Sequence, residues 1–448
     1  MDRFQVLNFF EQNKEFYSTT VSSNIERYRK GNCKVTVLDK NGAKLKNVKV
    51  NITQKSHAFR FGANLFMLDE LETEEKNCLY KKYFKDAFNM ATLPFYWKST
   101  EPQPNELRFD KGCSRYYRRP SIDLCIEFCK ENGIEPREHA LAYEQHFPNW
   151  LKDKSVDEVK ALLEKRYQEI SQRYGDKINT IEVTNEMFWW HGVTPFYDED
   201  DYVEWCFKLA EKYFPNNQLV VNEATEECWC EVRRSTNKYY SYIKNALLCG
   251  AKIDAIGMQF HMFYSREQEK EKSQSFYNPQ NLYNYLDFFS KLVDTLQITE
   301  ITVPAYSEKD EDEEIQAKII ENLYRLWFSH PCVEQIIYWN LVDGYAYVHD
   351  PTPEKIARTQ GDMSVGENVY YGGLLRFDLT PKPAYQVIKH LITKEWHTSL
   401  ESLTNSEGSV DFRGFYGDYQ IEIDTENGIV TREFSIVKNG ESNITISL

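Results

Sequence analysis

A short apolar, β-rich run recurs about every 30 to 50 residues through most of this 448-residue chain. The eight runs are 57–66, 88–97, 136–144, 180–187, 219–224, 253–261, 297–303 and 335–342. Helix-like sequence separates them, with clear amphipathic spacing at 156–175 and 312–330. Strand and helix patterns that alternate eight times predict an α/β fold of the (β/α)8 TIM-barrel type. An open doubly wound sheet competes, but it usually carries a glycine-rich loop after its first strand, and none follows here.

The segments that flank this repeat have a different pattern. From about residue 400 onward, period-two alternation and turn sequences such as ENG and NGE predict strands without helices. Residues 33–54 alternate around an NG turn, which predicts a β-hairpin. Since a hairpin alone cannot bury a face, we expect it to join the C-terminal strands in one small β-sandwich that braces the barrel.

These patterns divide the chain into three parts. Residues 1–55 form an N-terminal segment, helical at its start and carrying the hairpin, which we assign to the accessory β-domain. Residues 56–395 form the (β/α)8 barrel, and residues 396–448 complete the accessory domain. A barrel plus a small second domain fits the chain length.

Charge and composition exclude several classes of partner. The formal net charge of -15 argues against nucleic acid and anionic membranes. No stretch approaches 18 apolar residues and no secretory signal pattern opens the chain, so a cytoplasmic protein is expected, or an extracellular one if a signal was removed. The cysteines and histidines lack the paired spacings of metal sites, so neither a metal nor a cofactor is expected. The oligomeric state is left open.

Polar residues gather at the C-terminal ends of the runs, where a parallel barrel forms its active site. Glu186 ends the fourth run and Glu300 lies near the end of the seventh. Other polar or aromatic residues in or beside these ends are His139, Tyr143, Glu144, Asn185, Gln259, His261 and Trp339. Glycosidic bond cleavage requires two facing carboxylates, because one protonates the leaving oxygen while the other attacks the anomeric carbon or activates water. The expected partner is therefore a carbohydrate.

Several fragments carry a more specific resemblance. TNE at 184–186, IDAIGMQFH at 253–261, ITE at 298–300, YWN at 338–340 followed by Asp343, and LLRFDLTPKPAY at 374–385 occur in this order, and HALAYEQHFPNWL spans 139–151. On these fragments the chain resembles glycoside hydrolase family 10, the β-xylanase family, over roughly residues 57–390. The resemblance implies a retaining hydrolase of β-linked oligo- or polysaccharides, most similar to an endo-1,4-β-xylanase.

The resemblance also implies residue roles. Glu186 would be the acid/base and Glu300 the nucleophile. Asn185 would contact the 2-hydroxyl, Gln259 would contact the substrate near the nucleophile, and His139 would line the glycone side. His261 would orient Glu300, and Trp339 would be a stacking platform. Trp97 persists from the family pattern, and Tyr143 and Glu144 are also expected beside the sugar. Trp150 either lines the same side of the sugar site as Trp339 or packs in the core. Trp189, Trp190 and His191 belong either to the aglycone loop or to ordinary packing.

The residues that read the glycone sugar depart from the family pattern. Thr92, Leu93 and Tyr96 stand where Glu, Asn and Lys are typical, and Tyr143-Glu144 replaces Trp-His. Thr302 replaces an Asp that supports the histidine behind the nucleophile, so His261 is expected to lean on Glu300 or another neighbour.

These departures leave alternatives open. One is a β-glycosidase with a different glycone, or exo-action on imported oligosaccharides. A second is a barrel that binds carbohydrate without cleaving it, although binding alone would not require both carboxylates. A third is a metal-dependent hydrolase, which would need clustered His and Asp ligands at the strand ends.

Overall fold

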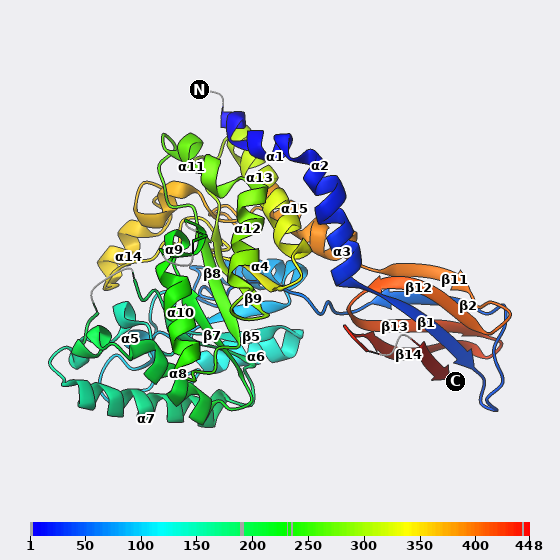
Figure 1. Ribbon diagram of the computed structural model, residues 1–448, viewed down its shortest axis with the longest axis horizontal. Helices are drawn as coiled ribbons and strands as arrows, with labels where there is room; N and C mark the ends of the chain where they lie inside the picture. Colours follow the sequence, from blue (N-terminus) through cyan, green and yellow to red (C-terminus); the bar gives the residue numbers. More distant parts are fainter. Residues whose placement is uncertain (1–2, 189–191, 231, 234–235, 441–442) are drawn as a thin grey trace.

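Eight parallel strands close into a barrel in the computed structural model, which describes residues 3–188, 192–230, 232–233, 236–440 and 443–448. The strands are β3 (Arg60–Asn64), β4 (Met90–Pro94), β5 (Glu135–His139), β6 (Thr180–Asn185), β7 (Gln218–Glu223), β8 (Ala255–His261), β9 (Leu296–Thr302) and β10 (Val333–Tyr338). They pair in chain order, and β10 returns to β3 (Figure 1). Each strand overlaps one predicted run, so the (β/α)8 barrel is confirmed.

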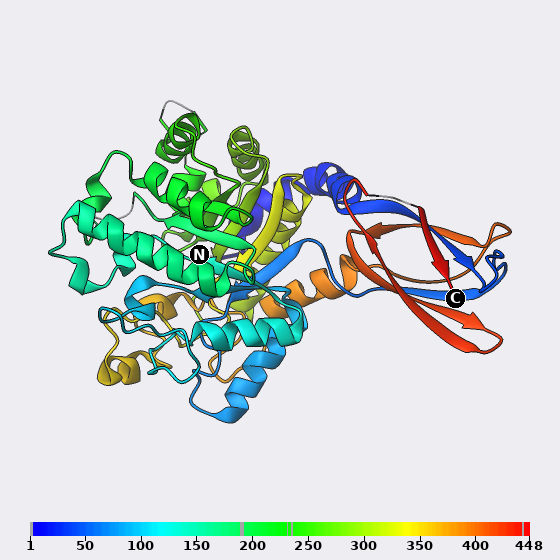
Figure 2. The ribbon, with the colours of Figure 1, turned by 90° about the horizontal axis from the view of Figure 1, so that it is seen from below.

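Helices surround the barrel strands (Figure 2). Those of the barrel are α4 (Glu74–Ala87), α5 (Trp97–Thr100), α6 (Ile122–Asn132), α7 (Val156–Tyr174), α8 (Tyr202–Tyr213), α9 (Thr225–Trp229), α10 (Lys238–Leu248), α11 (Glu269–Phe276), α12 (Pro279–Phe289), α13 (Asp310–Ser329), α14 (Pro353–Thr359) and α15 (Pro383–His390). A capping box between Ser155 and Glu158 starts α7, the first of the two helices predicted from spacing. In the described part of the chain, no helix is long and apolar enough to cross a bilayer.

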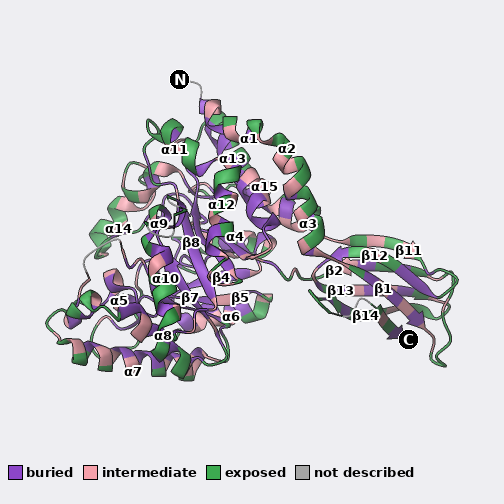
Figure 3. Ribbon diagram, viewed as in Figure 1, coloured by how far each residue is buried: buried purple, intermediate pink, exposed green. Residues whose placement is uncertain are grey.

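A β-sandwich stands beside the barrel (Figure 1). Its strands are β1 (Lys30–Leu38), β2 (Lys49–Gln54), β11 (Ser399–Leu403), β12 (Ser409–Phe415), β13 (Gly417–Thr425), β14 (Gly428–Ile436) and β15 (Asn443–Ser447). One sheet has the order β12-β1-β15 and the other β11-β2-β13-β14. Val35 and Ile421 belong to an apolar core between the sheets that is distinct from the barrel core (Figure 3). The expected accessory β-sheets are therefore present.

The two N-terminal strands do not form the predicted hairpin. β1 pairs with β12 and β15, whereas β2 pairs with β11 and β13, so they lie in opposite sheets. Between them, a single bridge joins Leu38 and Lys44. The alternation predicted strands correctly because each strand buries one face, but alternation does not say which strand pairs with which.

The residues before β1 are helical, as predicted, but they pack on the barrel. They form α1 (Asn8–Gln12), α2 (Lys14–Phe16) and α3 (Ser22–Arg29), and α3 packs against α13 (Figure 1). Phe10 belongs to the barrel's apolar core, and Arg3 forms a 2.8 Å ion pair with Glu269. The assignment of all of residues 1–55 to the accessory domain is thereby corrected: its helical part belongs with the barrel.

Candidate active site

A cavity of about 330 Å³ lies at the C-terminal ends of the barrel strands. Its lining comprises Phe66, Tyr96, Arg118, Arg119, His139, Tyr143, Gln145, His146, Asn185, Glu186, Ala224, Thr225, Glu226, Gln259, His261, Phe263, Glu300, Trp339, Tyr347 and Glu367. Eight of the ten site residues expected from the sequence are among them. The exceptions are Glu144 and Trp97.

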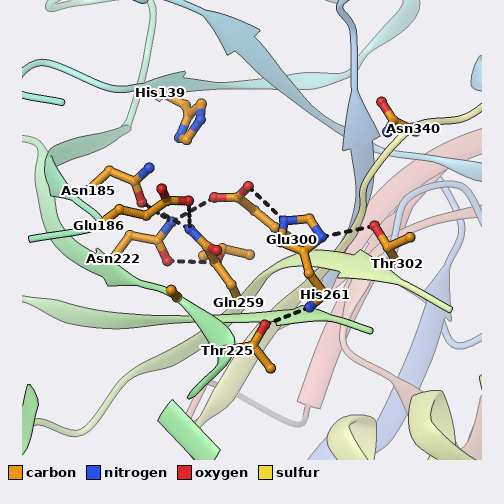
Figure 4. Close-up of polar contacts among 12 residues, drawn as sticks. His139, Asn185, Glu186, Asn222, Thr225, Gln259, His261, Glu300, Thr302 and Asn340 are labelled. Carbon is orange, nitrogen blue, oxygen red and sulfur yellow. Dashed lines mark hydrogen bonds and ion pairs between the residues drawn. The ribbon is translucent and has the colours of Figure 1, made fainter. Parts of the chain in front are cut away.

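Glu186 and Glu300 face each other across this cavity (Figure 4). Glu300 belongs to β9 and is 3% exposed, while Glu186 directly follows β6 and is partly exposed. The backbone of Glu186 has φ of 51°, an uncommon conformation for a residue other than glycine. Such backbone strain is concentrated at functional sites, and here it aims a carboxylate from the strand end into the cavity.

Three amide side chains connect the two carboxylates. Asn222 Nδ2 donates to Glu300 Oε1 at 2.9 Å, and Gln259 Nε2 donates to Glu186 Oε1 at 3.1 Å (Figure 4). Both amides also donate to Asn185 Oδ1, at 3.0 and 3.2 Å. Asn185 Nδ2 is buried and has no hydrogen-bond partner among the residues that the structure describes. It is therefore a donor available to a ligand.

His261 supports Glu300, as the sequence led us to expect. Its Nε2 lies 3.2 Å from Glu300 Oε2, and its Nδ1 lies 2.9 Å from the hydroxyl of Thr302 (Figure 4). A threonine hydroxyl both donates and accepts, so it fixes the protonation of the ring less firmly than an Asp would. The ring of Trp339 lies edge-on to His261, with centroids 5.8 Å apart, and presents an aromatic wall to the cavity.

His139 is held on both ring nitrogens. Nδ1 lies 2.7 Å from Glu182 Oε1 and Nε2 lies 2.8 Å from the Tyr96 hydroxyl. Burial would raise the pKa of Glu182, but His139 and Arg137 outweigh it and hold that pKa below its usual range. His139, Glu182 and Glu300 each bring one possible metal-ligand atom within 4.8 Å of the others. Because both nitrogens of His139 are already engaged, hydrogen bonding accounts for this cluster.

Tyr143 controls the environment of Glu186. Its hydroxyl donates to Glu186 Oε2 at 2.5 Å. Burial raises the pKa of Glu186, and the nearby carboxylate of Glu300 raises it further, whereas the hydrogen bonds from Tyr143 and Gln259 oppose the shift without cancelling it. Glu186 is therefore suited to hold a proton.

Glu144 does not lie in the cavity, which corrects its expected place in the sugar-binding shell. Its carboxylate accepts hydrogen bonds from the backbone nitrogens of Val193 and Thr194, at 2.9 and 3.1 Å, and from the Thr194 hydroxyl at 2.6 Å. Burial raises its pKa to about 7. It holds a loop, because the chain turns between Tyr143 and Glu144 and only the tyrosine faces the site.

Trp97 also lies behind the site and does not line the cavity, where its sugar contact was expected. It is 2% exposed, packs edge-on against Phe147 and Trp150, and donates Nε1 to Glu101 at 2.8 Å. Trp150 therefore belongs to core packing, one of its two expected roles. Trp189, Trp190 and His191 lie outside the described residues.

Several cavity residues were not predicted. Arg118 and Arg119 come from the loop between α5 and α6, Tyr347 and Glu367 follow β10, and Phe66 follows β3. Apart from Phe66, the last residue of the first run, none of them ends an apolar run, so inspection of strand ends does not find them. The consecutive arginines of YYRRP were the available signal, because they follow the strand whose usual sugar-reading residues are replaced.

Curated proteins include relatives that align with most of this chain. Anti-sigma-I factor RsgI6 of Acetivibrio thermocellus is 25% identical over 412 residues, covering 89% of this chain and 45% of that protein. Endo-1,4-beta-xylanase 3 of Arabidopsis thaliana is 24% identical, covering 89% of this chain and 46% of that protein. The chain thus spans less than half the length of these two relatives.

Solved structures and family comparison agree with the barrel. Xylanase 10B of Thermotoga maritima superposes with a TM-score of 0.58 at 20% identity, over 75% of this chain and 96% of that chain, which shows a shared fold. The family model described as glycosyl hydrolase family 10 matches residues 53–391, a range that contains the whole barrel and both facing carboxylates. The resemblance expected from the sequence is confirmed, and the chain belongs to glycosyl hydrolase family 10.

Proposed function

We propose that this chain is a retaining β-glycoside hydrolase of the endo-1,4-β-xylanase type. The observation that carries the proposal is the pair Glu186 and Glu300, which face each other across the cavity in different hydrogen-bonding environments. Family membership supports hydrolysis of a glycosidic bond. Endo-1,4-beta-xylanase B of Thermotoga neapolitana, 23% identical over 75% of this chain and 88% of that protein, supports a β-1,4-xylan substrate.

The first chemical step uses both carboxylates at once. Protonated Glu186 donates its proton to the glycosidic oxygen while ionised Glu300 attacks the anomeric carbon. The bond from that carbon to the leaving oxygen breaks, the leaving sugar departs as an alcohol, and an ester forms between Glu300 and the glycone. Asn222 and His261 orient the attacking carboxylate through their contacts at 2.9 and 3.2 Å.

The second step reverses the roles. Glu186, now ionised, removes a proton from water, and the water oxygen attacks the anomeric carbon and displaces Glu300. Two inversions leave the product with the configuration of the substrate. The raised pKa of Glu186 suits both halves, because the group must give and then take a proton near neutral pH.

The cavity offers matching sugar contacts. Asn185 Nδ2, a buried donor without a partner among the described residues, would meet the 2-hydroxyl, a contact that strengthens in the transition state. His139 and Trp339 lie 5.5 Å apart by ring centroids and would border the glycone. Tyr96 and the two arginines of the α5–α6 loop line the cavity. They are not the residues with which the family usually contacts the glycone xylose, so the proposal includes other glycones and exo-action.

A barrel that binds carbohydrate without cleaving it is the second candidate. One relative, matched over 89% of this chain, is named an anti-sigma factor rather than an enzyme. The two candidates differ in one measurable respect, which is turnover of a β-linked oligosaccharide.

Product analysis tests the proposal. Incubation with β-1,4-linked xylotetraose is expected to release shorter oligosaccharides whose new reducing end is first seen by proton NMR as the β-anomer, because double displacement retains configuration. A panel of β-linked gluco-, manno- and galacto-oligosaccharides tests other glycones. Initial release of the α-anomer would contradict retention, and binding without release of any product would favour the second candidate.

Tyr143→Phe is expected to move the alkaline limb of the kcat/KM profile to higher pH. The hydroxyl donates at 2.5 Å to Glu186, which stabilises the ionised form and lowers the pKa of this carboxyl. Loss of that bond raises the pKa, and activity, which requires the protonated form, persists by on the order of one further pH unit. Tyr370→Phe is the control, because it also removes a tyrosine hydroxyl, but from a ring that packs against Phe263 and does not line the cavity. An unmoved alkaline limb would contradict the role of Tyr143.

A further inference from the structure

Two adjacent arginines lie buried at one end of the cavity. Arg118 and Arg119 are 3% and 5% exposed. Arg118 donates to the backbone carbonyl of Tyr345 and, at 2.7 Å, to Oδ1 of Asn340. Among the described residues, its Nε has no partner, and the guanidinium of Arg119 donates a single hydrogen bond, from Nη1 to the carbonyl of Arg118 at 2.9 Å. A guanidinium carries five donors, so most of those on Arg119 are unused.

The positive charge of this pair is incompletely compensated. Within the described part of the chain, no acidic side chain forms an ion pair with either guanidinium, and Glu367 reaches Arg118 only through Asn340. Burial lowers the pKa of Arg119, and Arg118 adds to that effect. The rings of Tyr96 and Phe66, with centroids 4.1 and 4.9 Å from Arg119 Cζ, offset part of the cost of burial. A buried charge without an acid partner still carries a desolvation penalty.

The pair faces the same cavity as the two carboxylates. Tyr96 contacts Arg119 with its ring face and His139 with its hydroxyl, so the arginine stands on the glycone side of the proposed site. Arg118 has φ of 60°, a strained conformation for arginine that the surrounding structure must maintain. A ligand that brings a negative charge would supply the missing acid partner.

We infer that the glycone end of the cavity binds a uronate, a sugar unit bearing a carboxylate, through Arg118 and Arg119. The inference rests on the proposed function, since it names the substrate class of the same site. Planar guanidinium groups match carboxylates with charge-assisted hydrogen bonds, which neutral hydroxyls do not equal. The carboxylate belongs either to a uronic acid branch on a xylose unit or to a uronic acid in the main chain, and both offer the same group to the arginines.

Calorimetric binding of matched ligands tests the inference on the unmodified protein. The first pair is a xylobiose with one glucuronic acid branch and a sulfur-linked backbone that resists cleavage, and its methyl ester. The second pair is phenyl 1-thio-β-glucuronide and its methyl ester, which place the carboxylate on a main-chain unit. In one of the pairs the acid is expected to bind at least about tenfold more tightly than the ester, equivalent to about 1.4 kcal/mol.

Variants connect the preference to the arginines. Arg119→Met keeps an extended side chain against Tyr96 and removes the charge, and Arg118→Gln keeps a donor, so each is expected to reduce the acid preference to less than about twofold. Arg115→Met is the matched control, because this guanidinium lies on the same loop, pairs with Glu70 and does not line the cavity. Circular dichroism checks that each variant is folded.

Each outcome decides the inference. Equal binding of acid and ester in both pairs would overturn it, as would a preference that survives both substitutions, and the unmodified protein decides alone if a variant does not fold. Cleavage of unbranched xylotetraose is measured separately. A protein that cleaves xylotetraose but shows no acid preference contradicts only uronate binding, whereas one that prefers the acid but cleaves nothing contradicts only hydrolysis.

Discussion

Replacing Glu300 with alanine is expected to reduce hydrolysis of every accepted substrate by on the order of 10^4-fold or more, because no other group can form the bond to the anomeric carbon. Glu300 receives a hydrogen bond from Asn222 at 2.9 Å and lies 3.2 Å from Nε2 of His261. These donors orient a carboxylate, and they have nothing to orient in the variant. Steady-state rates on an aryl β-xyloside with a good leaving group measure the loss, since proton donation matters little there.

A matched carboxylate provides the control for Glu300→Ala. Glu226 lines the same cavity, and Glu226→Ala is expected to cost far less than Glu300→Ala. Added azide should restore part of the Glu300→Ala rate by occupying the vacated space and attacking the anomeric carbon, which yields an α-glycosyl azide by a single inversion. Activity of Glu300→Ala close to that of the native protein would assign the nucleophile to another residue.

The barrel could be predicted because its signal is repetitive. A strand buried on both faces is mostly apolar, so each of the eight runs marks its own strand, and the order of the runs gives the order of the strands. The sandwich carries a weaker signal. Residues 33–54 show two strands with an NG turn, yet β1 and β2 separate into opposite sheets because their partners lie more than 300 residues away.

The facing carboxylates could be predicted for a related reason. Glu186 and Glu300 lie at strand ends, and the C-terminal ends of parallel strands meet at one edge of a barrel. A residue in a turn beyond a strand lacks this geometric constraint. Tyr143 and Glu144 are adjacent, but the tyrosine hydroxyl reaches Glu186 while the Glu144 carboxylate binds Thr194 in a loop. Sequence gives no periodicity from which that difference could be read.

The glycone end depends on long connections, which explains why it was missed. Arg119 meets Tyr96 within the long connection between β4 and β5, and it meets Tyr347 from the segment after β10, so residues distant in sequence build one wall. No pattern within any one segment records that meeting. The departures at Thr92 and Leu93 were visible in the sequence, and both residues are fully buried in β4 rather than at the cavity. The residues that line the glycone end instead come from loops, and only the structure shows how those loops pack together.

Replacing Glu186 with alanine is expected to have an effect that depends on the leaving group. Hydrolysis of xylotetraose, whose leaving sugar is a poor one, should fall by about 10²- to 10⁴-fold, because the glycosidic oxygen then departs without a proton. Formation of the covalent intermediate from a dinitrophenyl β-xyloside should fall little, because that phenolate leaves unaided. Burst kinetics should then show rapid release of dinitrophenol followed by slow turnover, since the second step has lost its base.

The pH profile gives an independent reading of the same substitution. Burial and Glu300 raise the pKa of Glu186, so native activity should decline as pH rises through that pKa and the acid form is lost. Glu186→Ala removes the titrating group, and the alkaline limb should disappear for dinitrophenyl β-xyloside. Azide should accelerate the variant and give a β-glycosyl azide, the opposite anomer to that from Glu300→Ala, because it attacks the intermediate on the face that water would use. Equal losses on good and poor leaving groups, with an unchanged alkaline limb, would exclude Glu186 as the acid.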